Sequence, residues 1–455
     1  MTIVTTYSPA TLRAIKKATV RLLPLMGLLY FFNYLDRVNV GYAALRMNED
    51  LGLSSAAYGL GAGLFFIGYF IFEVPSNLML HKVGARVWIA RIAITWGILA
   101  TCMAFVNSSE TFYLVRFLTG IAEAGLFPGL ILFLTYWFPR ARRAKITAMF
   151  ILAIPLSSVF GAPVSSLLLQ HGGGWLGFEQ SWRVMFFLEG IPPIIIGICT
   201  LFLLPNRPRD AKWLTAEEKS ELTQVIDAED AQQVQGRGHM PLKRALTSSR
   251  VVGLAITYFG ITYGLYAMSF FLPQIISGFQ ESFGSKLSLL QIGLVTAIPF
   301  GIGAVAMLLN AWHSDKTSER RFHTAIPVVV GAVGIAVAMN LGSPSTTVVA
   351  ISVGAAGIFA ALAVFWQLPS AFLTGTAAAG GIAMINSFGN LSGFVGPYLT
   401  GWLHDLTGNY KAGMFLVAGF MLLSAAIVYK LGRTRDDEGL QNASPDLAPR
   451  VHQAT

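Results

Sequence analysis

The sequence predicts an all-α polytopic membrane protein with twelve transmembrane helices, and three observations lead to this fold class. Hydrophobic residues make up 54% of the 455 residues and charged residues only 12%, whereas about a quarter of the residues in a soluble domain are charged. Apolar stretches of about 20 residues, the length of a transmembrane helix, recur along the chain. Each stretch is too continuous to alternate like a barrel strand. The composition therefore excludes a soluble protein.

Length and hydropathy define the spans, and the basic residues orient them. The predicted spans are residues 22–45, 56–78, 86–106, 111–138, 145–169, 183–204, 251–273, 288–310, 325–341, 347–369, 377–403 and 412–431. Of the 32 Lys and Arg residues, 25 lie in the two terminal segments and alternate loops, and four lie in the opposite loops. Because cytoplasmic loops carry the excess of positive charge, both termini are expected in the cytoplasm. This asymmetry also explains the net charge of +9 without a nucleic-acid partner.

The spans fall into two sets of six with nearly equal lengths. This pattern predicts a cytoplasmic N-terminus (1–21), an N-terminal six-helix bundle (22–204), a cytoplasmic linker (205–250), a C-terminal six-helix bundle (251–431) and a cytoplasmic tail (432–455). Basic loops follow the second and the eighth span, and this repetition indicates the internal duplication typical of many secondary transporters. Within the linker, Leu214 to Ala231 is expected to form a short amphipathic helix.

Motifs for enzymes, metals and cofactors are poorly represented. Cys102 and Cys199 both fall inside apolar spans, so neither a disulfide framework nor a thiolate metal site is expected. Residues 301–306 match a dinucleotide fingerprint by letters, but they lie within an apolar span without a preceding strand. Close helix packing is the better interpretation of these glycines. The sequence thus predicts no enzyme, no cofactor and no metal. The first span is too long for a cleavable signal peptide.

Ionisable residues inside the spans are concentrated in the first half. A charge at the centre of a span costs about 2.5–3.5 kcal/mol on insertion scales, so such residues need a structural or functional reason. The candidates are Asp36, Arg37, Glu73, Arg91, Arg116 and Glu123, with Glu189 as a seventh.

Position along the spans separates two groups among these charges. Glu73 and Arg91 lie toward cytoplasmic span ends, and we expect them to form a gate with nearby loop residues; the full gating set is Glu73, Arg86, Arg91, Asp315 and Arg320. The central residues Asp36, Arg37, Arg116 and Glu123 are the functional candidates. A purely structural charge network that locks the helices together is the alternative.

The central charges combine fixed cations with titratable acids. Arg116 and Glu123 are seven residues apart, so they project from nearly the same helix face about 10 Å apart. Asp36 and Arg37 point about 100° apart and enter different surroundings. A fixed cation beside a titratable carboxylate suits a site where an anion and a proton are exchanged.

Polar residues in the spans of the second half are uncharged. They are candidates either for hydrogen bonds between helices or for ligand contact. The set comprises Tyr266, Gln367, Asn386 and Asn390, and Tyr69 is a comparable aromatic candidate in the first half.

Several motifs together resemble the major facilitator superfamily and, within it, the anion:cation symporter family of organic-anion transporters. The motifs are Asn33–Gly41, Phe72–Leu78, Arg116–Gly125, Tyr136–Pro139, Ser314–Arg321 and Ile385–Gly393. The resemblance covers about residues 22–431. Asn77 and His81 stand where the superfamily usually has Gly and Asp in the loop after the second span.

This resemblance implies two six-helix bundles around a central site and proton-coupled uptake of a small organic carboxylate by alternating access. The expected substrate is an aromatic or hydroxylated acid of the phthalate or tartrate kind. Arg37 and Arg116 are expected near the anion, Asp36 and Glu123 as proton sites, and Tyr69 and Asn386 as further contacts.

The expected partners follow from the same resemblance. They are a small organic anion, protons and the lipid bilayer of a bacterial inner membrane, with the protein acting as a monomer. An uncoupled facilitator or exchanger is the close alternative. A membrane sensor built on a transporter scaffold is a more distant one, because neither the linker (205–250) nor the tail (432–455) is long enough for a large output domain.

Overall fold

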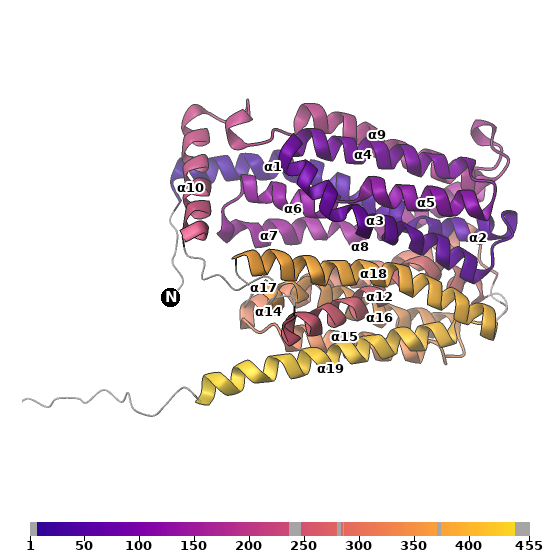
Figure 1. Ribbon diagram of the computed structural model, residues 1–455. Helices are drawn as coiled ribbons and strands as arrows, with labels where there is room; N and C mark the ends of the chain where they lie inside the picture. Colours follow the sequence, from indigo (N-terminus) through magenta and orange to yellow (C-terminus); the bar gives the residue numbers. More distant parts are fainter. Residues whose placement is uncertain (1–6, 236–246, 280–283, 285, 371–374, 442–455) are drawn as a thin grey trace, which may run out of the picture.

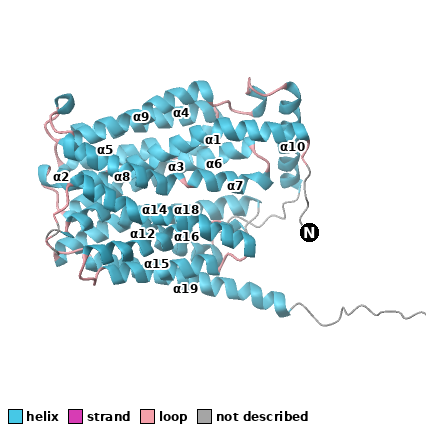
Figure 2. Ribbon diagram, turned by 180° about the vertical axis from the view of Figure 1, so that it is seen from behind, coloured by secondary structure: helices cyan, strands magenta, loops and turns pink. Residues whose placement is uncertain are grey.

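The computed structural model describes residues 7–235, 247–279, 284, 286–370 and 375–441, and this part of the chain folds into helices without a strand (Figures 1 and 2). The first half contains α1 (Pro9–Val38), α2 (Val40–Asp50), α3 (Ser55–Val83), α4 (Ala85–Cys102), η1 (Met103–Phe105), α5 (Ser109–Glu123), α6 (Leu126–Trp137), α7 (Arg140–Ile151), α8 (Ala153–His171), η2 (Trp175–Gly177) and α9 (Ser181–Leu203). The linker contains η3 (Pro208–Asp210) and α10 (Ala216–Gln235). The second half contains α12 (Ser249–Ser277), α14 (Leu289–Thr317), α15 (Phe322–Ala338), α16 (Pro344–Phe365), α17 (Gln367–Ser370), α18 (Gly375–Thr407) and α19 (Lys411–Gln441).

Each predicted span overlaps at least one of these helices. Among the described residues, ten helices are long and apolar enough to cross a membrane, and α15 is a shorter apolar helix. Helix α18 covers the eleventh predicted span. The all-α polytopic fold is confirmed, whereas the number of crossings and the cytoplasmic termini stay predictions.

The first and last helices are longer than the sequence predicts. Helix α1 begins at Pro9, because Ser8 accepts a hydrogen bond from the Thr11 amide (3.1 Å) and proline suits the first helical position. Helix α19 continues to Gln441, into the predicted tail. Residues 1–6, 236–246 and 442–455 of the predicted terminal and linker segments lie outside the described residues.

The linker helix α10 packs against the start of α1, at the left of Figure 1. Lys17 Nζ lies 2.9 Å from the Glu218 carboxylate, whose side chain is only 2% exposed, and Arg13 Nε lies 3.8 Å from it. The hydrogen bond from Lys17 is the largest of the effects that lower the pKa of Glu218. Just before α10, Trp213 stacks on Trp137 of α6 at 5.4 Å between ring centroids. These contacts attach the linker helix to the first half of the chain.

A glycine interrupts the fourth apolar segment at mid-length. Gly125 adopts φ +88°, which separates α5 from α6 directly after Glu123. A Cβ atom at this position would also lie 2.7 Å from Cβ of Ser76. Both the left-handed backbone and the close approach of α3 therefore require glycine. The interruption leaves Glu123 as the last residue of α5, in the interior of a membrane-spanning segment.

The helices of the first half lie together on one side of the molecule, and those of the second half lie on the other (Figures 1 and 2). The closest contacts between them pair α3 with α18, α8 with α14 and α2 with α12. We call the end near α2 the α2 end and the opposite end the α10 end. The glycines at the start of residues 301–306 in α14 serve close helix packing, because Gly303 lies directly against Phe359 of α16.

The two halves meet tightly at the α2 end. Asp405 of α18 accepts hydrogen bonds from the amides of Ser55 (3.0 Å) and Ala56 (2.8 Å) at the start of α3. A Cβ atom on Gly59 would lie 2.8 Å from the carbonyl carbon of Pro397. A Cβ atom on Gly41 would lie 2.8 Å from the backbone carbonyl oxygen of Ser269. Backbone therefore contacts backbone across the two halves, and the α2 end is closed.

Candidate functional site

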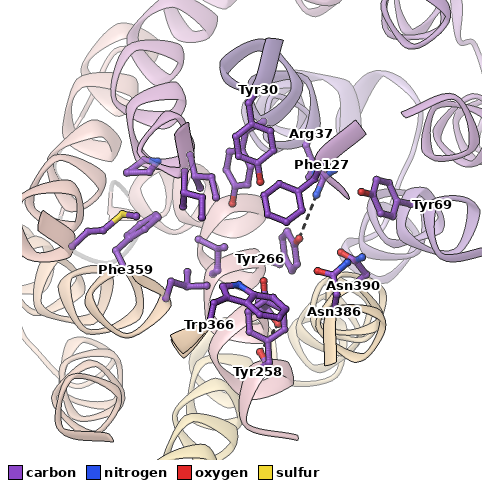
Figure 3. Close-up of a pocket in the computed structure, with 18 residues that line it drawn as sticks. Tyr30, Arg37, Tyr69, Phe127, Tyr258, Tyr266, Phe359, Trp366, Asn386 and Asn390 are labelled. Carbon is purple, nitrogen blue, oxygen red and sulfur yellow. Dashed lines mark hydrogen bonds between the residues drawn. The ribbon is translucent and has the colours of Figure 1, made fainter. Parts of the chain in front are cut away.

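A cavity lies between the two halves of the chain (Figure 3). Its polar lining consists of Arg37, Thr262, Asn386 and Asn390 together with tyrosine hydroxyl groups. The aromatic residues on its wall are Tyr30, Tyr34, Tyr69, Phe127, Tyr258, Tyr266, Phe359 and Trp366. Among the described lining residues, Arg37 carries the one permanent charge.

Arg37 connects both halves at the cavity wall. It lies in the last turn of α1, is 7% exposed and forms an ion pair with Glu123 at the end of α5. Its Nη1 also lies 3.5 Å from the hydroxyl oxygen of Tyr266 on α12, as the dashed line in Figure 3 shows. The guanidinium carbon lies 5.2 Å from the centre of the Tyr69 ring. A cation with one carboxylate partner and an aromatic face can still bind an incoming anion.

Arg116 lies outside this cavity lining. Its side chain is 2% exposed, and Nη2 donates to the carbonyl oxygen of Ala62 at 3.3 Å. Both arginines lie near the ring of Phe65, whose centre is 5.1 Å from Cζ of Arg37 and 4.9 Å from Cζ of Arg116. Only Arg37 of the two predicted anion-binding arginines lines the cavity.

The two predicted proton sites occupy different surroundings. Glu123 contacts Arg37 beside the cavity, and its side chain is fully buried. Asp36 instead faces α4, where Trp96 Nε1 donates to Oδ2 at 2.7 Å. Oδ1 of Asp36 is buried without a hydrogen-bond partner among the described residues. The 100° turn between consecutive helix residues explains why Asp36 and Arg37 point apart.

Glu73 lies at the edge of the cavity. Asn386 Nδ2 donates to Oε1 at 2.7 Å, and Asn390 Nδ2 donates to Oε2 at 3.4 Å. The sequence places Glu73 near a span end, but α3 continues to Val83, about 15 Å further along the helix axis. The side-chain contacts of Glu73 are thus with α18, and a gating role of Glu73 stays a prediction. These contacts connect α3 to α18.

The other residues of the predicted gate do not form one cluster either. Arg91 places its guanidinium 4.0 Å from the ring centre of Trp88. Asp315 pairs with Arg320 at 2.9 Å, within the second half. The backbone amide of Arg86 donates a hydrogen bond to Oδ1 of Asn206 at 2.9 Å. A gating role of these residues stays a prediction.

Comparison with known proteins identifies the family at this point. The profile of the Major Facilitator Superfamily matches residues 26–380. The chain belongs to the major facilitator superfamily. It is 48% identical over 427 residues to the "Putative tartrate transporter" of Agrobacterium vitis, covering 94% of this chain and 96% of the relative. It is 38% identical over 421 residues to "Inner membrane transport protein RhmT" of Escherichia coli K12, covering 92% and 95%.

Solved structures show the same fold. A bacterial homologue of the human lysosomal transporter Spinster superposes with a TM-score of 0.71 at 17% sequence identity, covering 95% of this chain and 99% of that one. This major facilitator protein is accordingly a multi-pass membrane transporter of bacterial type and not an enzyme.

Four of the predicted polar candidates line the transporter's cavity. They are Tyr69, Tyr266, Asn386 and Asn390. Gln367 does not line it, although the preceding residue Trp366 does. Predictions from sequence missed the other tyrosine and phenylalanine residues of the lining, because Tyr and Phe in apolar spans resemble packing residues. One signal was available, since Tyr30, Tyr34 and Arg37 follow the spacing of a single helix face.

Glu189 of the transporter is a second carboxylate held by neutral donors. Ser165 Oγ donates to Oε1 at 2.6 Å, and Asn39 Nδ2 donates to Oε2 at 2.9 Å. All three residues belong to the first half, and none of them lines the cavity. Glu189 thus ties α9 to α8 and to the junction of α1 and α2.

Proposed function

We propose that this transporter takes up a small organic carboxylate together with protons, as a member of the anion:cation symporter family. The observation that carries the proposal is Arg37, a permanent cation on the cavity wall that forms an ion pair with Glu123. Arginine suits carboxylate binding, because its planar fork matches two carboxylate oxygens. The proposed substrate is an aromatic or hydroxylated acid, in keeping with the tartrate in the name of the Agrobacterium relative.

Competition for Arg37 supplies the proposed coupling. The guanidinium can pair with Glu123 or with the substrate carboxylate, but it neutralises only one negative charge. A substrate that takes this cation leaves Glu123 as a buried carboxylate without its partner, which favours uptake of a proton. By reciprocal linkage, a protonated Glu123 then favours anion binding by the same factor. Asp36 is the second candidate for a proton site.

Charge balance is consistent with this coupling. A monoanion that enters alone moves against an interior-negative potential at a cost of about 2.3 kcal/mol per 100 mV. One proton cancels this cost, and two make the potential favourable. With Asp36 and Glu123 as two sites, the transporter can drive a monoanion electrogenically or carry a dianion without net charge.

Alternating access by two six-helix bundles, 22–204 and 251–431, completes the proposal. With both termini in the cytoplasm, the α2 end faces away from the cytoplasm, and its contacts separate when the site opens outward. Residues toward the α10 end then control the opposite opening, and Arg86, Arg91, Asp315 and Arg320 are the candidates. A monomer contains the whole cavity, so we propose a functional monomer.

Transport in proteoliposomes tests the function. We expect radiolabelled carboxylates from a small panel to accumulate under an imposed inward pH gradient and to leave again when a protonophore is added. Accumulation that persists with the protonophore, or equilibration without accumulation, would indicate an exchanger or an uncoupled facilitator. Transport of none of the carboxylates would contradict the proposed substrate class.

A further inference from the structure

The orientation of two side-chain amides beside the cavity has a chemical consequence. Asn386 and Asn390 stand one helical turn apart on α18, and both turn their Nδ2 groups toward Glu73. A carboxylate only accepts hydrogen bonds, so an amide that contacts it must present its nitrogen. Glu73 therefore fixes which way both amides point. Figure 3 shows the two asparagines side by side next to Tyr69.

The carbonyl oxygens of the two amides remain available. Among the described residues, none donates a hydrogen bond to Oδ1 of Asn386 or of Asn390. Neither oxygen belongs to the buried polar atoms that lack a partner. Because both residues line the cavity, these oxygens are open to its contents. The second half thus offers hydrogen-bond acceptors at this point of the wall.

The geometry points to Glu73 as a positioning residue that makes the transporter selective for carboxylates bearing a hydrogen-bond donor. This inference rests on the proposed function, in which Arg37 holds the carboxylate. A hydroxyl group elsewhere on the substrate then donates to the carbonyl oxygens of Asn386 and Asn390. The preferred class is therefore a hydroxy acid, rather than an acid whose other substituents are all apolar or acceptors.

Burial of Glu73 stabilises the orientation of the Asn386 and Asn390 amides. Its side chain lies between α3 and α18 with 8% of the residue exposed, and the two asparagine amides come from the opposite half of the chain. A glutamine at this position has both a donor and an acceptor, so it permits the asparagine amides to turn over. The Glu73→Gln variant should then lose the distinction between hydroxylated and unhydroxylated acids while carboxylate binding at Arg37 continues.

Glu189 provides a matched control. It is also a buried carboxylate with two neutral donors, but those donors belong to its own half and lie away from the cavity. Glu189→Gln removes the same charge from the same type of environment. A general effect of neutralising a buried acid would appear in both variants, whereas an effect on the amides of α18 would appear only in Glu73→Gln.

The test measures binding of matched pairs to the purified full-length protein. The pairs are L-tartrate with succinate and mandelate with phenylacetate, which differ only in hydroxyl groups. In the unmodified protein we expect the hydroxylated member of at least one pair to bind on the order of tenfold more tightly. Glu73→Gln should bring this ratio close to one. Glu73→Asp, which keeps two acceptors, should retain much of it, and Glu189→Gln should leave it unchanged.

Other outcomes overturn the inference. A ratio near one in the unmodified protein, or equal weakening of both members in Glu73→Gln with the ratio preserved, would show that Glu73 does not set selectivity. If Glu73→Gln fails to fold, the double variant Asn386→Leu/Asn390→Leu removes both acceptors directly, and an unchanged ratio there would be equally decisive. Failure of all four acids and of the wider carboxylate panel to bind would instead contradict the proposed function, and with it this inference.

Discussion

Both halves contribute aromatic rings to the cavity wall, but the first half adds charge, whereas the second half adds amides. Arg37 and its partner Glu123 belong to the first half, and Asn386, Asn390 and Tyr258 belong to the second. Charged groups bind strongly and respond to protons, while neutral amides distinguish ligands through the direction of their hydrogen bonds. In the proposed function, the first half then supplies the coupling to protons and the second half supplies the discrimination between ligands.

Clustering the charges in one half also limits their cost. An isolated charge in a span costs about 2.5–3.5 kcal/mol, so neighbours that neutralise or polarise one another are favoured. Glu123 pairs directly with Arg37, while Arg116 uses the Phe65 ring and a backbone carbonyl oxygen. Within the described residues of the second half, no such cluster surrounds the cavity.

The largest expected effect would show whether coupling depends on the first half alone. Glu123→Gln imitates the protonated acid, so it should abolish accumulation driven by a pH gradient while preserving substrate counterflow. Uptake and counterflow in the same proteoliposomes measure both properties. Glu189→Gln, a buried carboxylate away from the cavity, is the control and should still accumulate substrate. Normal accumulation with normal pH dependence in both Glu123→Gln and Asp36→Asn would refute the proposed coupling.

The next effect separates the two arginines of the charged half. Arg37→Lys loses the planar fork at the cavity wall and should weaken apparent affinity at least about tenfold, which corresponds to about 1.4 kcal/mol. Arg116→Lys keeps the charge at a residue outside the cavity lining, and a change of about 0.5–1 kcal/mol in its cation–π contact with Phe65 corresponds to roughly two- to fivefold. Equilibrium binding of a labelled carboxylate measures both. Equal losses would mean that Arg116 contacts the substrate as directly as Arg37.

A smaller effect concerns the contact between the two halves at the α2 end. Asp405→Ala removes the cap on α3, which is worth about 1 kcal/mol, and should open this end about fivefold more often. Ser269→Cys places a thiol on a buried residue whose backbone carbonyl oxygen lies against Gly41, and its alkylation rate reports the opening. Glu217→Ala serves as the control, because this linker residue is 65% exposed and its partner Arg13 lies in α1, away from the contact between the halves. Unchanged alkylation in Asp405→Ala would show that the cap does not hold the halves together.

The smallest effect lies outside the membrane, in the linker. The pKa of Glu218 is lowered in the folded protein, so its contribution to docking is present above its ordinary pKa of 4.5 and is lost as pH falls through the lowered value. Glu218→Gln should raise amide hydrogen exchange in α10 a few-fold at neutral pH, and the difference from the unmodified protein should shrink in acid. Glu217, whose side chain is 65% exposed, provides the control variant Glu217→Gln. Equal exchange in all three proteins would exclude Glu218 as the docking residue.

Sequence patterns were sufficient for properties that depend on local composition. Runs of apolar residues predicted twelve spans, and each span overlaps at least one helix of the structure. The rarity of charged residues in membrane spans identified Arg37 and Glu123 as candidates. The pattern could not show that these two residues pair, because their partner choice depends on how α1 and α5 pack. The contact between Glu73 and Asn386 could not be predicted for the same reason, since the two residues are 313 positions apart in the sequence.

The role of aromatic residues in the spans could not be predicted from the sequence either. A tyrosine in an apolar span can fill a core or line a cavity, and the sequence is the same in both cases. Tyr30 and Tyr258 line the cavity only because helices from opposite halves leave space there. Phe65 lies near both arginines because α3 packs against α5 and its ring reaches Arg37 of α1.

Two glycines at the α2 end allow the backbones of the two halves to touch, because they have no side chain. Gly41 and Gly59 bind no ligand and carry no charge, yet a single methyl group at either one cannot be accommodated while the halves touch. Such residues influence how often a state is visited rather than what the state binds. Surveys of variants by ligand affinity would pass over them, whereas surveys by rate would find them. A substitution at either glycine is therefore expected to change the rate at which the α2 end opens and closes rather than the affinity for the ligand.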